Sequence, residues 1–514
     1  MAEGKTARKV ADIMSSPVVT AAPDETIAEV AERIRDSKVG SVVVTEGDKP
    51  VGILTERDLA HFAAGGRSAA EAKVSEIMTA DPDVITPDTR LEDTYRSFAS
   101  SGYRHMPVVA DDNLVGIVSM RDLMRVAHVT PVEEHALEVP RGLEGVAVAE
   151  TEIGDVRGRE GFYHYRQYNA VELAEKRSIE DVWHLLFEGE LPSKEQREKF
   201  IEEIRPLRQI PGEVKEILPN IARLGEKFRP LDALRSAYSV LASSLDLEPW
   251  LDVEYEELRK QALATCAVFP SLIMAMYRLR HGMEVVDPHP ELGYSENYLY
   301  TMTGEVPDKD HARAIEQYQI STIDHGFNAS TFTARVITST GADLGSAIAG
   351  ALGALSGPLH GGAPSRALDM LDAIQTPDNA EPWLRDAVSS GQRLMGFGHR
   401  VYKTDDPRSV MLRGVAERLG GPKIEFGKHV ERTAVKVLQE LKPGRDLYAN
   451  VEFYAGIVMD TAGIPRELFT PTFASSRVIG WSAHILEQAA DNRLIRPAAH
   501  YKGPEPPQPV PDPE

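Results

Sequence analysis

The sequence predicts a multidomain protein, in which an α/β pair of repeated units precedes a long and mostly α-helical part. Two observations support this prediction. An internal repeat occupies about the first 125 residues. Few strand signals appear after about residue 170, where apolar residues recur at helical spacing instead. The chain has 514 residues, which is enough for about two to four domains.

The internal repeat has a constant offset of 64 residues. A constant offset over three separate segments indicates two copies of one supersecondary unit. The matching segments are Ala11–Met14 with Ser75–Met78, Pro23–Asp24 with Pro87–Asp88, and Gly52–Leu59 with Gly116–Leu123.

Each copy is expected to alternate strands and helices. In the first copy, Asp24 is expected to cap a helix whose apolar residues Ile27, Val30 and Ile34 share one face. The following apolar runs are typical of buried strands. These strands are expected at Gly40–Val44 and Val51–Leu54.

A hydroxyl residue and a carboxylate three positions later stand at a strand-to-helix turn in each copy. The pairs are Thr55 with Asp58, and Ser119 with Asp122. The hydroxyl and the helix N-terminus can bind a phosphate, and the carboxylate can accept both ribose hydroxyls. The same spacing is also a helix-capping pattern that needs no ligand. The residues alone leave both interpretations open.

The repeat, from about Val10 to Val126, resembles a tandem cystathionine-β-synthase (CBS) domain pair. In that family the two copies pack as one disc with nucleotide clefts between them. The resemblance implies an adenine nucleotide effector, such as AMP or ATP. Its implied ligands are the turn residues Thr55, Asp58, Ser119 and Asp122.

Composition and charge exclude several partners. The formal net charge of −22 disfavours nonspecific binding to nucleic acid or to anionic membranes. No apolar run reaches the ~18 residues of a membrane span, and the first residues lack the apolar region of a signal peptide. The single cysteine, Cys266, cannot form an intrachain disulfide and is expected in an apolar helix. These features predict a cytoplasmic protein.

A connector and a helical part follow the repeat. The connector is expected from Ala127 to Ala136, and the tail after Gly503 is too rich in proline for a helix or a strand, so residues 504–514 are expected to be disordered. Clear helical patterns appear at Ile179–Phe187, Ala267–Leu279 and Ala342–Leu355.

Three histidines in the helical part each stand in a glycine-bearing string, and three arginines follow them in this region. Histidine can move a proton near neutral pH, glycine lets the backbone approach a ligand, and arginine grips carboxylates with two parallel hydrogen bonds. Together they predict acid–base chemistry on a small polycarboxylate. The residues are His325, His360 and His399, with Arg408, Arg477 and Arg496.

Two other kinds of site fit the spacing poorly. No histidine pair has the i, i+4 spacing of a helical zinc site and no cysteine is nearby, so no metal is expected. No serine stands in a nucleophile-elbow string beside the histidines.

From about Leu137 to Gly503 the chain resembles citrate synthase. Four strings carry the resemblance, in the order of that family: HGFNASTFTARV, GPLHGGA, GFGHRVYKTDDPR and NVEFYAG. The register also continues upstream through Gly142–Val146, Gly161–Arg166 and Leu191–Pro192. The resemblance implies a mostly α fold with a large and a small helical domain, the small one at about Gly362 to Ala462, hinged over a cleft.

The resemblance implies a step of the tricarboxylic acid cycle: condensation of acetyl-CoA with oxaloacetate and water to give citrate and CoA. No other cofactor is required. Motif matching makes Glu452 the base, His360 the donor to the thioester oxygen and His399 the group that polarises the ketone. The implied ligands of oxaloacetate are His325, Arg408, Arg477 and Arg496, and Lys403 matches a position that meets CoA phosphates. Arg496 is expected from the other subunit of a homodimer or larger homo-oligomer.

Two positions depart from the family pattern. Glu452 stands where the family usually has Asp; both carboxyls are expected to be ionised at neutral pH, but Glu reaches one methylene further. After Arg496, relatives often carry another basic residue before the Tyr, where this chain has Ala499 and His500. The alternatives are 2-methylcitrate synthase, which takes propionyl-CoA, and a nucleotide-sensing protein without catalytic activity.

Overall fold

The arrangement of the chain comes from a computed structural model. It describes residues 9–37, 39–64, 67–91, 93–94, 97–98, 105–120, 122–123, 141–143, 145–358, 360–361, 364–398, 402, 404–445, 447–499, 501–504 and 506–510. The chain divides into two compact units, one formed by Met1–Leu143 with Ala498–Glu514 and the other by Glu144–Pro497. We describe each unit separately.

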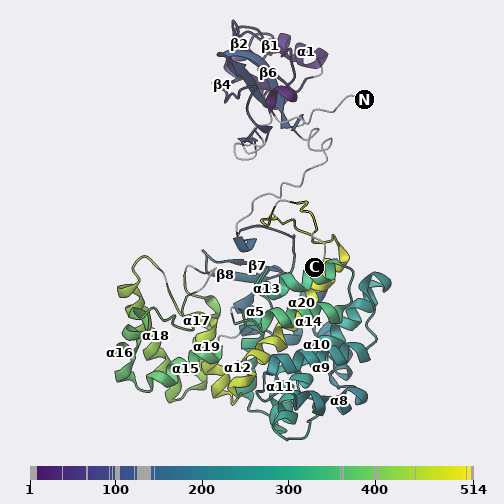
Figure 1. The fold of residues 1–514 in the computed structure, drawn as a ribbon, viewed down its shortest axis with the longest axis vertical. Helices are drawn as coiled ribbons and strands as arrows, with labels where there is room; N and C mark the ends of the chain where they lie inside the picture. The colour runs from purple at the N-terminus through teal and green to yellow at the C-terminus, as the bar shows by residue number, and fades with distance from the viewer. Residues whose placement is uncertain are drawn as a thin grey trace. The chain divides into compact units, whose positions relative to one another are not determined.

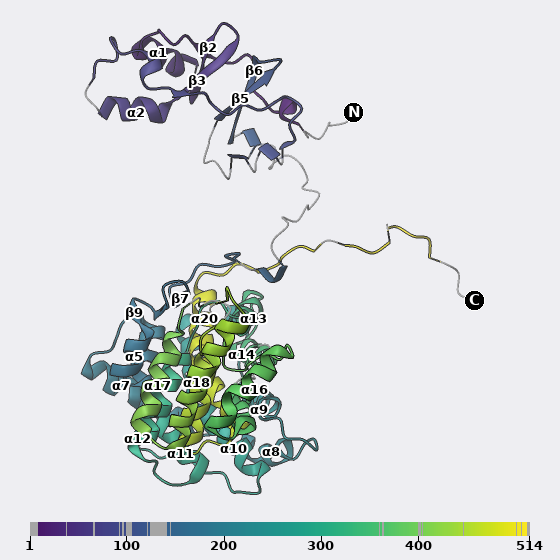
Figure 2. The same ribbon diagram turned by 90° about the vertical axis from the view of Figure 1, so that its left-hand side faces the viewer.

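The N-terminal unit contains two small sheets, which Figure 2 shows together with helices α1 and α2. The first sheet has the strand order β1-β2-β3-β4, with β1 parallel to β2 and the other pairs antiparallel. The second is an antiparallel pair of β5 and β6. The strands are β1 Thr20–Ala21, β2 Ser41–Glu46, β3 Lys49–Thr55, β4 Thr79–Ala80, β5 His105–Ala110 and β6 Asn113–Ser119, and the helices are α1 Ile27–Ser37 and α2 Glu56–Ala64.

The two copies exchange their leading segments. Thr79, at the start of the second copy, pairs with Ile53 in β3 of the first copy. Ser15, which lies 64 residues before Thr79, pairs with Ile117 in β6 of the second copy. The copies are therefore interlocked. The same position of each copy pairs with the same strand position of the other copy, so the 64-residue offset holds for the strand pairing as well as for the sequence.

The repeated glycine of each copy makes this exchange possible. A Cβ on Gly52 would lie 2.3 Å from Sδ of Met78, and a Cβ on Gly116 would lie 2.6 Å from Sδ of Met14. Each methionine therefore occupies the space where a side chain would otherwise stand, on the strand of the other copy.

The first helix confirms the predicted face and corrects the predicted cap. Ile27, Val30 and Ile34 are all buried. The helix begins at Ile27, and Thr26 rather than Asp24 caps it. The Thr26 hydroxyl accepts from the Glu29 amide, while the Glu29 carboxylate accepts from the Thr26 amide. A capping box needs its hydroxyl directly before the first helical residue, which Asp24 is too early to supply.

The second unit begins with a three-stranded antiparallel sheet, and its described residues are helical or irregular afterwards. The predicted change to an all-helical fold after about residue 170 is confirmed. The strands are β7 Gly154–Arg157, β8 Phe162–Tyr165 and β9 Tyr168–Asn169. The α-helices are α5 Ala170–Lys176, α6 Ile179–Glu188, α7 Lys194–Ile204, α8 Gly212–Ala222, α9 Pro230–Ser244, α10 Tyr255–Arg280, α11 Tyr294–Thr303, α12 Lys309–Thr322, α13 Ala329–Ser339, α14 Leu344–Leu355, α15 Pro364–Ile374, α16 Pro377–Ser389, α17 Pro407–Leu419, α18 Pro422–Leu441, α19 Val451–Thr461 and α20 Phe469–Ala490.

Short 3-10 helices complete the described regular structure. They are η1 Val10–Asp12, η2 Val74–Glu76, η3 Arg141–Leu143, η4 Pro206–Arg208, η5 Trp250–Asp252 and η6 Arg466–Leu468.

The core of the helical unit is built around α10 and α20, which pack against each other. By length and composition α10 is apolar enough to cross a membrane, but 78% of its apolar window is buried within this unit. Its Cys266 is buried, with Sγ 3.2 Å from the Ser482 hydroxyl of α20, and burial raises the pKa of this thiol to about 12. The helix is therefore a core helix, as the sequence predicts for the segment around Cys266.

The helices form a larger and a smaller group (Figure 1). Helices α15 to α19 pack among themselves, through the pairs α17 with α19 and α16 with α18. This group contacts the larger one through α12 and α20. The large and small helical domains expected from the sequence are thus present.

Helix α20 lies close to the backbone that follows α12. A Cβ on Gly480 would lie 2.1 Å from the carbonyl oxygen of Ile323 and 3.0 Å from its carbonyl carbon. Only a glycine lets the helix approach the chain at this point, which lies directly before Asp324 and His325.

We predict that Gly480→Ala destabilises the helical unit by about 1–3 kcal/mol, because the added methyl group overlaps backbone that cannot move aside easily. The matched control is Gly414→Ala in α17, where no heavy atom lies within 4 Å of the added Cβ. That variant gains up to about 1 kcal/mol of helix propensity. Thermal melting followed by circular dichroism at the helix band should give a lower Tm for Gly480→Ala only. Equal melting temperatures for the two variants would contradict the close contact.

Candidate active site

The loop between α12 and α13 carries His325. Gly326 adopts a left-handed conformation with φ of 61°, which turns the chain sharply after the histidine. Asn328 then caps α13, its Oδ1 accepting from the amides of Ser330 and Thr331. The string DHGFN is therefore a turn followed by a helix start.

His325 stands in a cluster with two tyrosines and one of the predicted arginines. Its Nε2 lies 3.0 Å from the Tyr402 hydroxyl, and its ring contacts that of Tyr163 with 5.6 Å between centroids. The Arg408 guanidinium lies over both tyrosine rings, at 5.9 Å from Tyr163 and 5.8 Å from Tyr402. Cation–π contact holds the arginine beside the histidine.

A buried carboxylate, Asp406, joins Arg408 to the start of α19. Its Oδ1 accepts from Arg408 Nε at 3.0 Å and its Oδ2 accepts from Arg408 Nη2 at 2.9 Å. Oδ2 also accepts from the Val451 amide at 3.0 Å. One carboxylate therefore fixes the guanidinium and the residue that precedes Glu452.

Glu452 stands in the first turn of α19, and its side chain is partly buried. Burial raises the pKa of this carboxyl to about 7, although the positive charges of Arg408 and Arg393 oppose the shift. The sequence predicts a carboxyl that is fully ionised at neutral pH, whereas desolvation disfavours the charged form and moves the pKa into the neutral range. A carboxyl with a pKa near neutrality can both take and return a proton.

His360 is held by the start of α13. Its Nε2 lies 2.8 Å from the Ser330 hydroxyl and 3.3 Å from the Ser330 amide nitrogen. Trp481 of α20 donates its indole N–H to the same hydroxyl at 3.0 Å. Because a backbone N–H can only donate, Nε2 offers its lone pair and the neutral ring carries its proton on Nδ1.

The protonation state of His360 agrees with this assignment. Burial, and secondarily the charge of Arg477, lower the pKa of His360 to about 4. The ring is therefore neutral at physiological pH, and its Nδ1–H is a donor that can stabilise a developing negative charge.

Arg477 lies in the middle of α20 and is 1% exposed. Its Nε donates to the Thr322 carbonyl at 2.8 Å, and its guanidinium stacks on Phe473 at 4.5 Å. Among the described residues no carboxylate forms an ion pair with it. Burial lowers the pKa of Arg477 from its ordinary value, yet a guanidinium stays charged in proteins. A buried cation without an ion-pair partner in the described part of the chain is well suited to bind an anionic ligand.

The strings around His399 and Glu452 are hydrogen-bonded to each other. The Gly398 amide donates to the Tyr448 carbonyl at 2.8 Å, and the Asn450 amide donates to the Gly396 carbonyl at 2.8 Å. His399 and Lys403 themselves lie outside the described residues. The backbone that leads to His399 is nevertheless anchored beside the start of α19.

The structure thus brings together five of the predicted residues and leaves one apart. Arg408 is linked to His325 through Tyr163 and Tyr402 and to the start of α19 through Asp406, and its charge acts on Glu452. The charge of Arg477 acts on His360. Arg496 lies in the irregular segment after α20 and is exposed. No described hydrogen bond or ion pair joins it to the other residues.

Several residues that shape the site were not singled out from the sequence as site residues. Tyr163 and Tyr402 stand inside matching strings, but nothing local marks them as neighbours. Asp406 stands two residues before Arg408, a spacing at which a carboxylate can fix a guanidinium, and this pattern is the one local signal for its role. From the sequence alone, Ser330 is an ordinary residue at the start of a helix and Trp481 is an ordinary aromatic residue of the core. Their roles arise from contacts between distant segments.

The turn residues of the N-terminal unit form capping interactions. Asp58 Oδ2 accepts from the Thr55 amide at 2.8 Å and from its hydroxyl at 2.7 Å. Asp122 Oδ2 accepts from the Ser119 amide at 2.9 Å and from its hydroxyl at 2.6 Å. The predicted strand-to-helix turns are present, and each uses one oxygen of its carboxylate.

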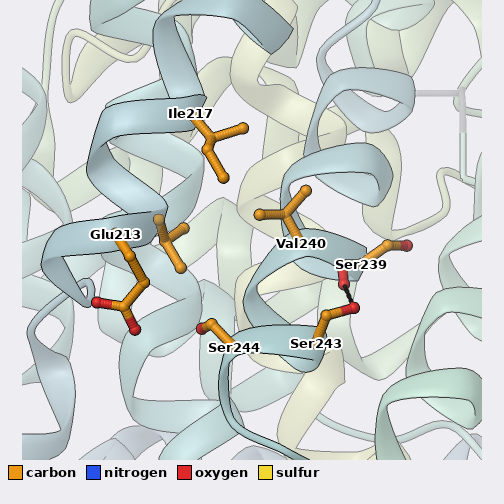
Figure 3. Close-up of a pocket in the computed structure, with 7 residues that line it drawn as sticks. Glu213, Ile217, Ser239, Val240, Ser243 and Ser244 are labelled. Atoms are coloured by element: carbon orange, nitrogen blue, oxygen red, sulfur yellow. Dashed lines mark hydrogen bonds between the residues drawn. The ribbon is translucent and has the colours of Figure 1, made fainter.

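The described surface of the helical unit includes a groove between α8 and α9. It is lined by Val214, Ile217, Val240 and Ser243, among others, and contains none of the predicted site residues (Figure 3). A larger cleft lies between α5 of the larger helix group and α17 of the smaller group, and none of the predicted site residues lines it either. No group of three or more potential metal ligands occurs among the described residues.

Comparison with known proteins identifies both parts of the chain. The family model "Citrate synthase, C-terminal domain" matches residues 142–498, and the model "CBS domain" matches residues 10–65 and 74–129. The citrate synthase of Haloferax volcanii is 38% identical over 368 residues, covering 71% of this chain and 96% of the relative. Citrate synthase 2 of Bacillus subtilis is 39% identical over 366 residues, covering 71% of this chain and 96% of the relative.

Solved structures agree. Citrate synthase from Thermotoga maritima is 35% identical with a TM-score of 0.64, and covers 73% of this chain and 98% of that chain. The citrate synthase of Thermoplasma acidophilum, solved as a ternary complex with carboxymethyl coenzyme A and oxaloacetate, is 32% identical with a TM-score of 0.67, and covers 73% of this chain and 98% of that chain. The chain therefore belongs to the citrate synthase family of enzymes, with a tandem pair of CBS domains ahead of its citrate synthase domain.

Proposed function

We propose that the protein condenses acetyl-CoA with oxaloacetate and water to give citrate and CoA. The observation that carries this proposal is the combination of a partly buried carboxyl with a pKa of about 7, Glu452, and a buried guanidinium, Arg477, that has no ion-pair partner among the described residues. The first can remove a proton from a weak carbon acid, and the second can hold a carboxylate.

Glu452 removes a proton from the methyl carbon of acetyl-CoA. Negative charge then develops on the thioester oxygen, where the Nδ1–H of the neutral His360 donates a hydrogen bond. A neutral donor is well suited to this role because Ser330 already holds it in place, so no reorganisation is needed as the negative charge develops. The enol carbon attacks the ketone carbon of oxaloacetate, and the ketone oxygen takes up a proton.

The carboxylates of oxaloacetate are held by Arg408 and Arg477, with His325 beside them. Arg408 is fixed by Asp406 and by two tyrosine rings, so it does not have to be ordered when the substrate binds. Water finally cleaves the condensed thioester to release citrate and CoA.

The remaining predicted residues complete the proposed site. His399 polarises the ketone and supplies its proton, and Lys403 binds a phosphate of CoA. Arg496 reaches the site from a second subunit, which fits its exposed position in a single chain. Closure of the smaller helix group on the larger one, with oxaloacetate bound, would exclude water from the reactive enol.

We propose the same limits for the parts of the chain as the sequence predicts. The CBS pair occupies residues 10–126, the linker 127–136 and the synthase domain 137–503, whose small subdomain spans about 362–462. The tail, 504–514, stays outside the folded parts. The protein acts as a homodimer or larger homo-oligomer in the cytoplasm, where the buried Cys266 stays reduced.

The first test is the initial rate of CoA thiol release, with and without oxaloacetate, from acetyl-CoA and from propionyl-CoA. We expect release that depends on oxaloacetate and is faster with acetyl-CoA. One methylene in an acyl pocket is worth about 1–3 kcal/mol, so the ratio of the two rates should lie between about 10 and 200. Faster release from propionyl-CoA would favour 2-methylcitrate synthase. No release with either thioester, from folded protein, would favour a nucleotide sensor without catalytic activity.

The control variant for this assay is Glu452→Gln. It keeps the size of the side chain but cannot accept the methyl proton. General-base catalysis is worth about 10²–10⁴-fold in rate, so kcat should fall by that factor with little change in the KM for oxaloacetate. Unchanged turnover would show that Glu452 is not the base.

We also propose that an adenine nucleotide binds at the CBS pair and changes this rate. The support is the equivalent turn geometry of the two copies, in which Asp58 and Asp122 stand beside a hydroxyl at a strand-to-helix turn. The phosphates would bind at the turn and the ribose hydroxyls at the carboxylates.

Asp58→Ala with Asp122→Ala should abolish any change in rate caused by AMP or ATP, while the rate without nucleotide should remain. The matched control is Asp36→Ala, which removes an exposed carboxylate paired with Arg35 in the same unit. That variant should keep the nucleotide response. Thermal melting of each variant checks that the lost capping interaction has not unfolded the unit. A response that persists in the double variant would contradict the assignment.

A further inference from the structure

The loop that carries His325 is anchored by the carboxylate directly before it. Asp324 is 1% exposed, and its Oδ2 accepts from the Gly326 amide at 3.0 Å. The two bonded residues enclose His325 between them. The position of the Asp324 carboxylate therefore sets the position of the His325 backbone.

A buried histidine on α20 holds this carboxylate from behind. Nε2 of His484 lies 3.3 Å from Asp324 Oδ1, and Nδ1 of His484 lies 3.2 Å from Nη1 of Arg335. His484 is completely buried. A third charged group, Glu487, lies 4.0 Å from Nδ1 of His484 and is paired with Arg335, so it makes no direct hydrogen bond to the ring.

The geometry fixes the protonation of His484. A guanidinium has only donors, so the contact with Arg335 requires a lone pair on Nδ1. The ring proton is then on Nε2, where it donates to Asp324. His484 is thus a neutral ring that accepts from a cation on one side and donates to an anion on the other.

Arg335 is itself fixed. It forms an ion pair with Glu487, and its Nε donates to Gln488 Oε1 at 2.9 Å. Glu487 in turn accepts from the Glu152 amide at 2.7 Å. These groups form a row in which hydrogen-bond acceptors and donors alternate. It runs from the partly exposed Glu487 carboxylate through Arg335 and His484 to the buried Asp324.

The loop held in this way also reaches the second histidine of the site. It continues through Asn328 into Ser330, whose hydroxyl lies 2.8 Å from His360 Nε2. Displacement of Asp324 would therefore shift the loop on which His325 stands and, through it, the residue that orients His360.

We propose that His484 is a positioning residue for the condensation. It touches no reacting atom; as a neutral donor it holds Asp324, and through Asp324 it holds His325 in place for oxaloacetate. The inference rests on the proposed function, because it is that function that assigns oxaloacetate to His325.

Two substitutions distinguish the hydrogen bond made by Nε2 of His484 from the one made by Nδ1. The carboxamide of Gln reaches the position of imidazole Nε2, so His484→Gln keeps a donor toward Asp324. The carboxamide of Asn reaches only the position of Nδ1, so His484→Asn keeps an acceptor toward Arg335 and loses the donor to Asp324. The control for general loss of a buried histidine is His184→Gln. Nδ1 of His184 lies 3.0 Å from the Glu190 carbonyl, on a helix that carries none of the site residues.

We expect His484→Asn to raise the KM for oxaloacetate by about tenfold or more, because a displacement of about 1 Å at the site is costly. His484→Gln should stay within about threefold of the wild type. His184→Gln should lower the Tm without changing this KM. An equal KM for the Asn and Gln variants, or a KM unchanged in both, would overturn the positioning role and leave His484 a structural residue.

The outcome is distinguishable from failure of the proposed function. If the wild type releases no CoA, calorimetric binding of oxaloacetate to the full chain replaces turnover as the measurement. Weaker binding by His484→Asn than by His484→Gln would then still support the positioning role. No binding of oxaloacetate by the wild type would overturn both proposals.

Discussion

The contact between α20 and the end of α12 is the constraint on which the site depends. Gly480 lets α20 lie against the backbone of Ile323, and Arg477, three residues earlier, binds the Thr322 carbonyl. Because α20 is a single rigid helix, this contact fixes Arg477, Trp481 and His484 relative to the loop of His325 at the same time. Three functions, which are holding an anion, orienting His360 and anchoring Asp324, thus follow from one packing geometry.

The second constraint is electrostatic, because the site buries more charge than a folded core normally tolerates. Asp406 compensates Arg408, and the row behind Asp324 ends in the pair of Arg335 and Glu487. Unpaired charges in an apolar interior are costly, so the remaining ones indicate function. Among the described residues, buried Arg477 and partly buried Glu452 form no ion pair, and burial shifts the pKa of each toward its neutral form. In the proposed function, bound oxaloacetate is the partner of Arg477.

Much of this could be predicted from the sequence, because it depends on local patterns. The 64-residue repeat, the helix with Ile27, Val30 and Ile34 buried, and the helical part around Cys266 follow from periodicity. The exchange of leading segments, the packing of Tyr163 on Arg408 and the contacts of His484 could not be predicted, because they arise between separate segments that no local pattern connects. The raised pKa of Glu452 could not be predicted either, since desolvation depends on tertiary packing and not on residue type.

The most direct test of the account is the pH dependence of kcat/KM for acetyl-CoA, measured between about pH 5 and 9, because kcat/KM reports the pKa of groups before acetyl-CoA binds. The base must be ionised, and burial raises the pKa of Glu452 to about 7, so kcat/KM should rise with pH through a midpoint near that value. His360, with a pKa of about 4, stays neutral over this range and adds no second step. A rate that is constant from pH 5.5 upwards, or a midpoint near 4.5, would show that Glu452 is an ordinary exposed carboxylate and would contradict the account.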